Sequence, residues 1–133
     1  MSALLLDTHT WAWLMTRSPG LSRRSIEEVG SAREAFVSPI SFFEIGQKVR
    51  LGKWPEMAPI ASRLSELLLE QGGRIATLTD EICLRAGTLA WVHRDPFDRI
   101  IVATATISNL KRLSADPVFD TLEPHAARPV RVW

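Results

Sequence analysis

Five acidic residues of this sequence lie at the ends of predicted strands or near the starts of predicted helices, where a parallel sheet would bring them together. They are Asp7, Glu44, Asp95, Asp98 and Asp116. In an open parallel α/β sheet, ligands bind outside the carboxyl ends of the strands, and we expect all five acids at that edge. Crowded carboxylates repel one another and raise one another's pKa. A divalent cation relieves this repulsion, so the joint placement of the acids indicates a metal site.

Each acid also has a purely structural interpretation. Three of them stand at the starts of predicted helices, and aspartate is a good N-cap. Ser41 and Glu44 have the S-x-x-E spacing of a capping box. Asp98 falls in the first turn of a predicted helix, where the helix dipole favours a negative charge. For each acid taken singly both interpretations stay open, and only their common placement favours metal binding.

Basic side chains accompany two of the acids. Lys48 lies one helical turn after Glu44, and Arg50 follows near the end of the same predicted helix. Arg99 comes directly after Asp98. A Glu–Lys pair on a helix surface stabilises the helix by only ~0.2–0.5 kcal/mol. The functional alternative is that these cations contact the phosphates of a nucleic acid, and we keep both.

Histidine and tryptophan residues near the acids also allow two interpretations. We expect His9 and His93 to pack or to form hydrogen bonds rather than to act as catalytic bases. Trp11 and Trp54 can stack on nucleobases. Tryptophan at helical spacing belongs more often to the core, so packing is the favoured interpretation for both.

The composition sets the class of protein. The chain has 133 residues and a mass of 14.9 kDa, which suits a single domain over residues 1–133. No apolar run reaches the ~18 residues of a membrane span, and no basic segment marks a signal peptide. The one cysteine, Cys83, excludes a disulfide scaffold and suits a reducing cytoplasm. With so few histidines and cysteines, zinc is disfavoured. The net charge of +1 means that any nucleic-acid contact uses a local basic patch.

Predicted strands alternate with predicted helices along the whole chain. We expect strands over residues 3–6, 35–38, 74–78 and 111–114, with an edge strand over 130–133. The expected helices cover residues 8–16, 23–35, 39–51, 60–70, 80–92 and 95–109, with a brief helix from 116. This alternation predicts an α/β fold in which helices cover both faces of a parallel sheet of four to five strands.

Four segments, taken together, resemble the PIN-domain family. They are LLLDTHT at Leu4–Thr10, SFFEIGQKVRLGK at Ser41–Lys53, HRDPFDRIIVATA at His93–Ala105 and LSADPVF at Leu113–Phe119. Each is weak alone, but all four occur in the family's order and spacing from residue 3 to about residue 120. The branch that they resemble most is the VapC-type ribonuclease toxins of bacterial toxin–antitoxin pairs.

This resemblance implies a three-layer α/β/α sandwich and an endoribonuclease that depends on Mg²⁺ or Mn²⁺. The residues that carry over as metal ligands are Asp7, Glu44, Asp98 and Asp116. Asp95 is an additional acid typical of the most similar branch, and Ser114 stands where the family often has threonine or serine near the metal. Around residues 109–112 the predicted strand is shorter and more polar than in the family, a departure that bears on the position of Asp116 rather than on its identity.

The expected reaction is hydrolysis of an RNA phosphodiester by water that paired divalent ions activate, leaving a 5′-phosphate and a 3′-hydroxyl. The leading interpretation is a toxin with a cognate antitoxin. The alternatives are a housekeeping PIN nuclease in RNA processing and an inactive α/β binding module. The resemblance also implies a homodimer. The tryptophans near the N-terminus and Trp54 support one, because they are more apolar surface than a small monomer readily hides.

Overall fold

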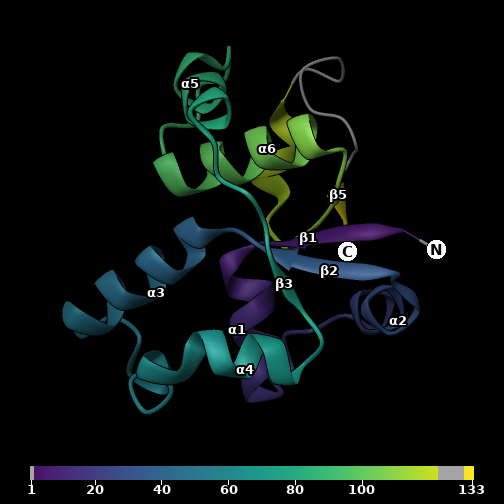
Figure 1. Cartoon of the computed structure of the whole chain (residues 1–133). Helices are drawn as coiled ribbons and strands as arrows, with labels where there is room; N and C mark the ends of the chain where they lie inside the picture. The colour runs from purple at the N-terminus through teal and green to yellow at the C-terminus, as the bar shows by residue number, and fades with distance from the viewer. Residues whose placement is uncertain (1, 123–130) are drawn as a thin grey trace.

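The structure is a computed structural model that describes residues 2–122 and 131–133. Among these residues the chain forms a five-stranded parallel sheet in the order β3-β2-β1-β4-β5 (Figure 1). The strands are β1 (Ala3–Leu6), β2 (Glu34–Val37), β3 (Arg74–Ile75), β4 (Lys111–Leu113) and β5 (Arg131–Val132). The predicted parallel sheet is confirmed, with β1 in the centre as expected for its apolar sequence.

Helices occupy the connections between the strands. The α-helices are α1 (Thr8–Thr16), α2 (Arg23–Ser31), α3 (Pro39–Arg50), α4 (Leu64–Glu70), α5 (Asp80–Thr88) and α6 (Pro96–Ser108). Short 3₁₀ helices are η1 (Pro55–Met57), η2 (Ala61–Arg63) and η3 (Pro117–Thr121). In the part of the chain that the structure describes, no helix is both long and apolar enough to cross a lipid bilayer.

The sheet is the middle of three layers, as the sequence and the resemblance predict. Leu4 and Leu6 face one side and pack with side chains of α1, α3 and α4, whereas Leu5 faces the other side and packs with α6. This alternation follows from the two-residue period of a strand. Figure 1 shows α5 and α6 on one side of the sheet and α1 and α4 on the other. Helices therefore cover both faces of the sheet, and the ends of the strands are the part of the sheet that they leave open.

Several predicted boundaries differ from the structure. The helix expected over 23–35 ends at Ser31, because β2 begins at Glu34, where it pairs with Ala3. The strand expected over 74–78 is only Arg74–Ile75, and the helix expected over 80–92 ends at Thr88. The helix expected over 60–70 is divided into η2 and α4. Of the predicted edge strand, Val130 lies outside the described residues.

The predicted capping box at Ser41 and Glu44 is wrong. Helix α3 begins at Pro39, as the sequence predicts, so its N-cap is Ser38, three residues before Ser41. The Ser38 hydroxyl accepts from the Ile40 amide. The Ser41 hydroxyl instead lies 2.8 Å from the hydroxyl of Thr8. Glu44 is thus one turn further into the helix than a capping residue would be, and its carboxylate is available for another role.

Candidate active site

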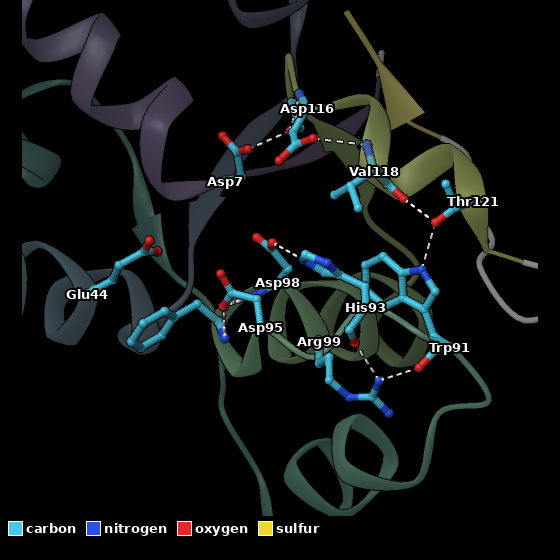
Figure 2. A network of polar contacts seen from close by, with 12 residues as sticks. Asp7, Glu44, Trp91, His93, Asp95, Asp98, Arg99, Asp116, Val118 and Thr121 are labelled. Carbon is cyan, nitrogen blue, oxygen red and sulfur yellow. Dashed lines mark hydrogen bonds and ion pairs between the residues drawn. The ribbon is translucent and has the colours of Figure 1, made fainter.

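One pocket lies at the carboxyl ends of the central strands and gathers all the acids singled out in the sequence. Its volume is about 360 Å³, and among the described residues it is lined by Asp7, His9, Trp13, Glu44, Lys48, Asp95, Asp98, Ala115, Asp116 and Pro117. Figure 2 shows the five carboxylates around one open space. The expected convergence of residues from distant parts of the chain is therefore present in the structure.

Asp7 is the most enclosed acid of the pocket. It follows β1, serves as the N-cap of α1, and is only 7% exposed. Its carboxylate accepts hydrogen bonds from the Thr10 amide at 2.8 Å and from the Ser114 hydroxyl at 2.5 Å. Burial raises the pKa of Asp7 above its ordinary value, and these hydrogen bonds only partly oppose that rise. Asp7 is both a cap and a pocket residue, so the two interpretations do not exclude each other.

Asp95 and Asp98 come from the start of α6. Asp95 is the N-cap and accepts from the Phe97 amide at 2.8 Å. The Asp98 carboxylate lies 2.6 Å from Nε2 of His93 (Figure 2). Burial raises the pKa of Asp98 to about 6, His93 opposes that rise, and the negative charges of Asp95 and Glu44 add to it. One potential ligand atom from each of His93, Asp95 and Asp98 lies within 4.8 Å of the others.

Glu44 and Asp116 complete the acidic lining from two further elements. Glu44 lies on α3, is 5% exposed, and has its carboxylate 2.7 Å from Nζ of Lys48. Asp116 follows β4, caps η3 by accepting from the Val118 amide, and donates its own amide to the Ser114 hydroxyl. Ser114 thus links the two acids that follow β1 and β4. The residue where the resemblance implies a hydroxyl near the metal does contact the site.

The donor set fits a hard divalent cation. The acids named above offer carboxylate oxygens, which Mg²⁺ and similar ions prefer as ligands. An ionised cluster of this kind costs free energy, as the raised pKa values of Asp7 and Asp98 indicate. A bound dication would offset that cost. Lys48 supplies a single positive charge at the rim and neutralises only part of the cluster.

The predicted basic contacts have separate outcomes. Lys48 lines the pocket and forms the Glu–Lys pair that was the structural alternative, so its contact with RNA stays a prediction. Arg50 lies at the end of α3 and is exposed, but it is not among the pocket's lining residues, so its contact with RNA stays a prediction. The two histidines behave as expected: His93 hydrogen bonds to Asp98, and His9 stacks against Trp54.

The assignment of Arg99 as an RNA contact is corrected. Its guanidinium donates to the backbone carbonyls of Ala86, Leu89, Trp91 and His93 at 2.6–2.9 Å. Figure 2 shows this side chain directed at the segment that carries Trp91 and His93. Arg99 therefore fastens the segment between α5 and α6, and it fixes the backbone from which His93 reaches Asp98. Sequence reasoning missed this role because backbone carbonyls leave no trace in residue identity.

Four residues that line the pocket were not predicted from the sequence to do so. Trp13, Ala115 and Pro117 line it, and His9 does so although packing was its expected role. His9 and Trp13 lie on the helix that Asp7 caps, and Ala115 and Pro117 flank Asp116 in the chain. Their nearness in sequence to two of the acids is a signal that could have indicated them.

The raised pKa of Asp98 predicts a dependence of stability on pH. The folded chain holds the Asp98 proton more tightly than the unfolded chain. Protonation of Asp98 therefore stabilises the folded chain, and this stabilisation is complete below the unfolded pKa of about 3.9. It is lost as the pH rises through the folded pKa of about 6. Without divalent ions, the melting temperature of the wild type should therefore fall relative to that of Asp98→Asn between about pH 4 and pH 7.

Thermal unfolding of both proteins across that range checks the prediction. Asp120→Asn supplies a control, because hydrogen bonds from Arg131 lower the pKa of Asp120. The stabilisation by the Asp120 carboxylate is therefore complete above about pH 4, and the difference in melting temperature between the wild type and Asp120→Asn should stay constant over the range tested. A constant difference in melting temperature between the wild type and Asp98→Asn would show that Asp98 titrates as an ordinary surface acid.

Comparison with known proteins agrees with the geometry. The sequence profile of the PIN domain matches residues 4–123. Ribonuclease VapC22 of Mycobacterium tuberculosis (strain ATCC 25618 / H37Rv) is 29% identical over 135 residues, and the match spans 100% of both chains. This relative is a named ribonuclease, and it is about as long as this chain.

Solved structures share the fold at lower identity. A chain of a toxin-antitoxin complex from Klebsiella pneumoniae is similar with a TM-score of 0.60 and 18% identity, over 98% of this chain and 96% of that one. A chain of VapBC2 from Rickettsia felis, bound to a promoter DNA fragment, gives 0.63 and 16%, over 90% and 92%. A chain of VapBC-1 from nontypeable Haemophilus influenzae gives 0.60 and 21%, over 86% and 87%.

The sequence match to the named ribonuclease spans the whole chain, and the structural matches cover 86–98% of it. The profile match alone includes every acid of the pocket. With a five-stranded parallel sheet, an acidic pocket at its carboxyl edge and a family match over most of its length, this chain belongs to the PIN domain family.

Proposed function

We propose that residues 1–133 form one nuclease domain that cleaves RNA internally and acts as the toxin of a toxin–antitoxin pair. The observation that carries this proposal is the convergence of five acids, from four separate elements, in one pocket. Membership of the PIN domain family and the similarity to a named ribonuclease over the full chain support it. The toxin–antitoxin complexes among the similar structures support the toxin role.

The side chains divide the work of the site among themselves. We propose that the metal ligands are Asp7, Glu44, Asp98 and Asp116, with Asp95 as a supporting acid. A divalent ion held there would supply positive charge to the phosphate and activate water for attack. Ser114 and the Thr10 amide fix the orientation of Asp7, and His93 fixes that of Asp98. Ligands held in this way need little reorganisation when substrate arrives.

Mg²⁺ or Mn²⁺ is the proposed ion. Both accept oxygen ligands, and Mg²⁺ keeps several water molecules when one or two carboxylates hold it. His93 lies beside Asp98, and Mn²⁺ can bind imidazole as well as carboxylate. The Nε2 atom of His93, however, contacts the Asp98 carboxylate.

A cleavage assay with defined products tests the proposal. Purified chain, first treated with a chelator, should leave a labelled RNA intact and should cleave it when Mg²⁺ or Mn²⁺ is restored. The products should carry a 5′-phosphate and a 3′-hydroxyl, which end-specific ligation distinguishes from a cyclic phosphate. Cleavage that persists in the chelator, or that leaves a 2′,3′-cyclic phosphate, would contradict a metal-dependent hydrolysis.

We also propose a cognate antitoxin and a homodimer as partners in the cytoplasm, where the exposed free thiol of Cys83 stays reduced.

The tryptophans do not support the dimer as the sequence suggested. Trp11 is buried at 1% exposure, Trp13 packs against Trp133, and Trp54 packs against the chain's own core. The exposed apolar side chains lie elsewhere, including Phe43 and Val92. Light scattering at about twice the monomer mass would support the dimer.

A further inference from the structure

Three aromatic rings stand at one side of the acidic pocket. His9 and Trp13 lie on α1, and Trp54 immediately precedes η1. The His9 ring stacks on Trp54, with ring centroids 4.8 Å apart and an interplanar angle of 28°. Trp13 meets the same His9 ring edge to face, at 6.3 Å and 70°. We call these three residues the aromatic wall.

The aromatic wall is fixed from behind. Trp13 packs against Trp133 with centroids 5.9 Å apart, and a Cβ added at Gly20 would approach the Trp13 ring to 3.2 Å. Trp54 packs against the core beneath the sheet. Rings that are held by the fold lose little conformational freedom when a ligand stacks on them.

Two of the three residues of the aromatic wall border the acidic pocket. His9 and Trp13 line the same pocket as the acids, and His9 is exposed although one of its faces lies on Trp54. Nζ of Lys48 lies 5.3 Å from the centre of the Trp54 ring and 2.7 Å from Glu44. An aromatic surface, a cation and the acids thus lie side by side, which is the combination that binds a base and its phosphate together.

We propose that the aromatic wall is a stacking site for one unpaired nucleobase beside the phosphate that is cleaved. The base would lie against the exposed His9 ring and extend the stack that Trp54 begins. This inference rests on the proposed RNA-cleaving function and adds a base-binding residue to it. The base must be unpaired, because a base within a duplex has both faces covered by its neighbours. The site therefore selects single-stranded RNA, or the loops and bulges of folded RNA.

Trp11 has no part in this site, although the sequence offered it as a candidate for stacking. It is 1% exposed and packs against Phe42 in the core. Trp54, the other candidate, supports the His9 ring and is not itself among the residues that line the pocket. The residue that presents a surface to the ligand is His9.

Equilibrium binding without turnover tests the proposal. Fluorescence anisotropy of a labelled oligoribonucleotide, measured in a chelator so that no cleavage occurs, should show tighter binding of the single strand than of the same sequence as a duplex. His9→Ala should weaken binding of the single strand about five- to tenfold, since a base–aromatic stack contributes at least that much. His9→Phe keeps a flat ring and should retain the affinity.

A matched control comes from helix α3. Phe43 is an aromatic residue next to Glu44 in the chain, is 59% exposed, and does not line the pocket. Phe43→Ala should leave the affinity for the single strand unchanged. Circular dichroism of all variants shows whether the fold is kept. If His9→Ala fails to fold, His9→Gln, which removes the ring with less loss of volume, takes its place.

The partner of His9 is found by removing bases one at a time. An abasic nucleotide at the stacked position should weaken binding to the wild type and should have no further effect on His9→Ala. A 2-aminopurine at that position should lose fluorescence on binding the wild type, which is a signature of stacking. Additive effects of His9→Ala and every abasic substitution would overturn the proposal.

The outcomes separate this inference from the proposed nuclease. Equal affinity for single strand and duplex, together with an unchanged affinity in His9→Ala, would overturn the stacking site while metal-dependent cleavage still supported the nuclease. Position-specific loss of binding in a chain that never cleaves RNA with either metal would support stacking and overturn the nuclease.

Discussion

Replacement of Asp98 by Asn is expected to lower RNA cleavage by at least about a hundredfold while the fold remains intact. The carboxylate lies in the pocket between His93 and Asp95, and an amide offers a ligand of lower charge there. A metal ion displaced by ~1 Å can by itself lower the rate about a hundredfold. Initial rates on a labelled RNA at saturating metal, alongside thermal unfolding of each protein, measure both parts of the prediction.

Asp7→Asn should cause a similar loss of activity and should not destabilise the chain. Asparagine is as good an N-cap as aspartate, so the bond from the Thr10 amide can be kept. The asparagine amide nitrogen cannot accept from the Ser114 hydroxyl as the carboxylate does, but it can donate to that hydroxyl instead. Burial raises the pKa of Asp7, which means that its negative charge is unfavourable in the folded chain at neutral pH. Removal of that charge should leave the melting temperature unchanged or raise it when no divalent ion is present.

Asp95→Asn is the matched control for both variants. Asp95 lines the same pocket and caps α6, and asparagine preserves the cap. Its effect on cleavage should be smaller than that of Asp98→Asn. If Asp7→Asn and Asp98→Asn both kept activity within a few fold of the wild type, the acids would act only as caps and the proposed site would be wrong.

The substitutions that lower RNA cleavage should also weaken metal binding. Calorimetry with Mn²⁺ should show a binding heat for the wild type that weakens in Asp98→Asn, without any dependence on RNA. Equal affinity of the wild type and of the amide variants at Asp7, Glu44, Asp98 and Asp116 would contradict a metal site built from these residues.

The positions of the acids could be predicted because the rule behind them is local. Asp7 and Asp116 each come within a few residues of a short strand, and the parallel arrangement of the strands brings their ends to one edge. The order of strands and helices followed from the alternation of apolar and amphipathic segments. None of this required knowledge of which side chains touch.

The contacts that orient the acids could not be predicted in the same way. Arg99 binds backbone carbonyls that any residue types would present, so its partners are invisible in the sequence. The cap of α3 depended on a choice between Ser38 and Ser41, and both precede helix-forming residues. The lengths of α2 and β3 were set by pairing with neighbouring strands rather than by local propensity.

Expression of the chain alone in a bacterial host is expected to stop growth, and Asp98→Asn is expected to restore it. An RNA-cleaving site that nothing covers acts on the RNA of its host, whereas the amide variant keeps the fold and loses the charge that holds the metal. Colony counts on inducing plates, together with immunoblots that show equal amounts of both proteins, measure the effect. Arrest by Asp98→Asn at equal expression would show that the harm does not come from cleavage.

Co-expression with the neighbouring reading frame should remove the arrest if that frame encodes the antitoxin. A protein inhibitor that reached the pocket with an arginine could pair with its carboxylates in bidentate fashion and compete with the metal. Lys48 already shows that a cation reaches this site, because its Nζ lies 2.7 Å from Glu44. The purified pair should then form a complex that does not cleave RNA, and excess Mn²⁺ should partly restore cleavage. A chain that cleaves RNA in vitro yet leaves growth unaffected when expressed alone would favour a housekeeping role in RNA processing, since such an enzyme needs no dedicated inhibitor.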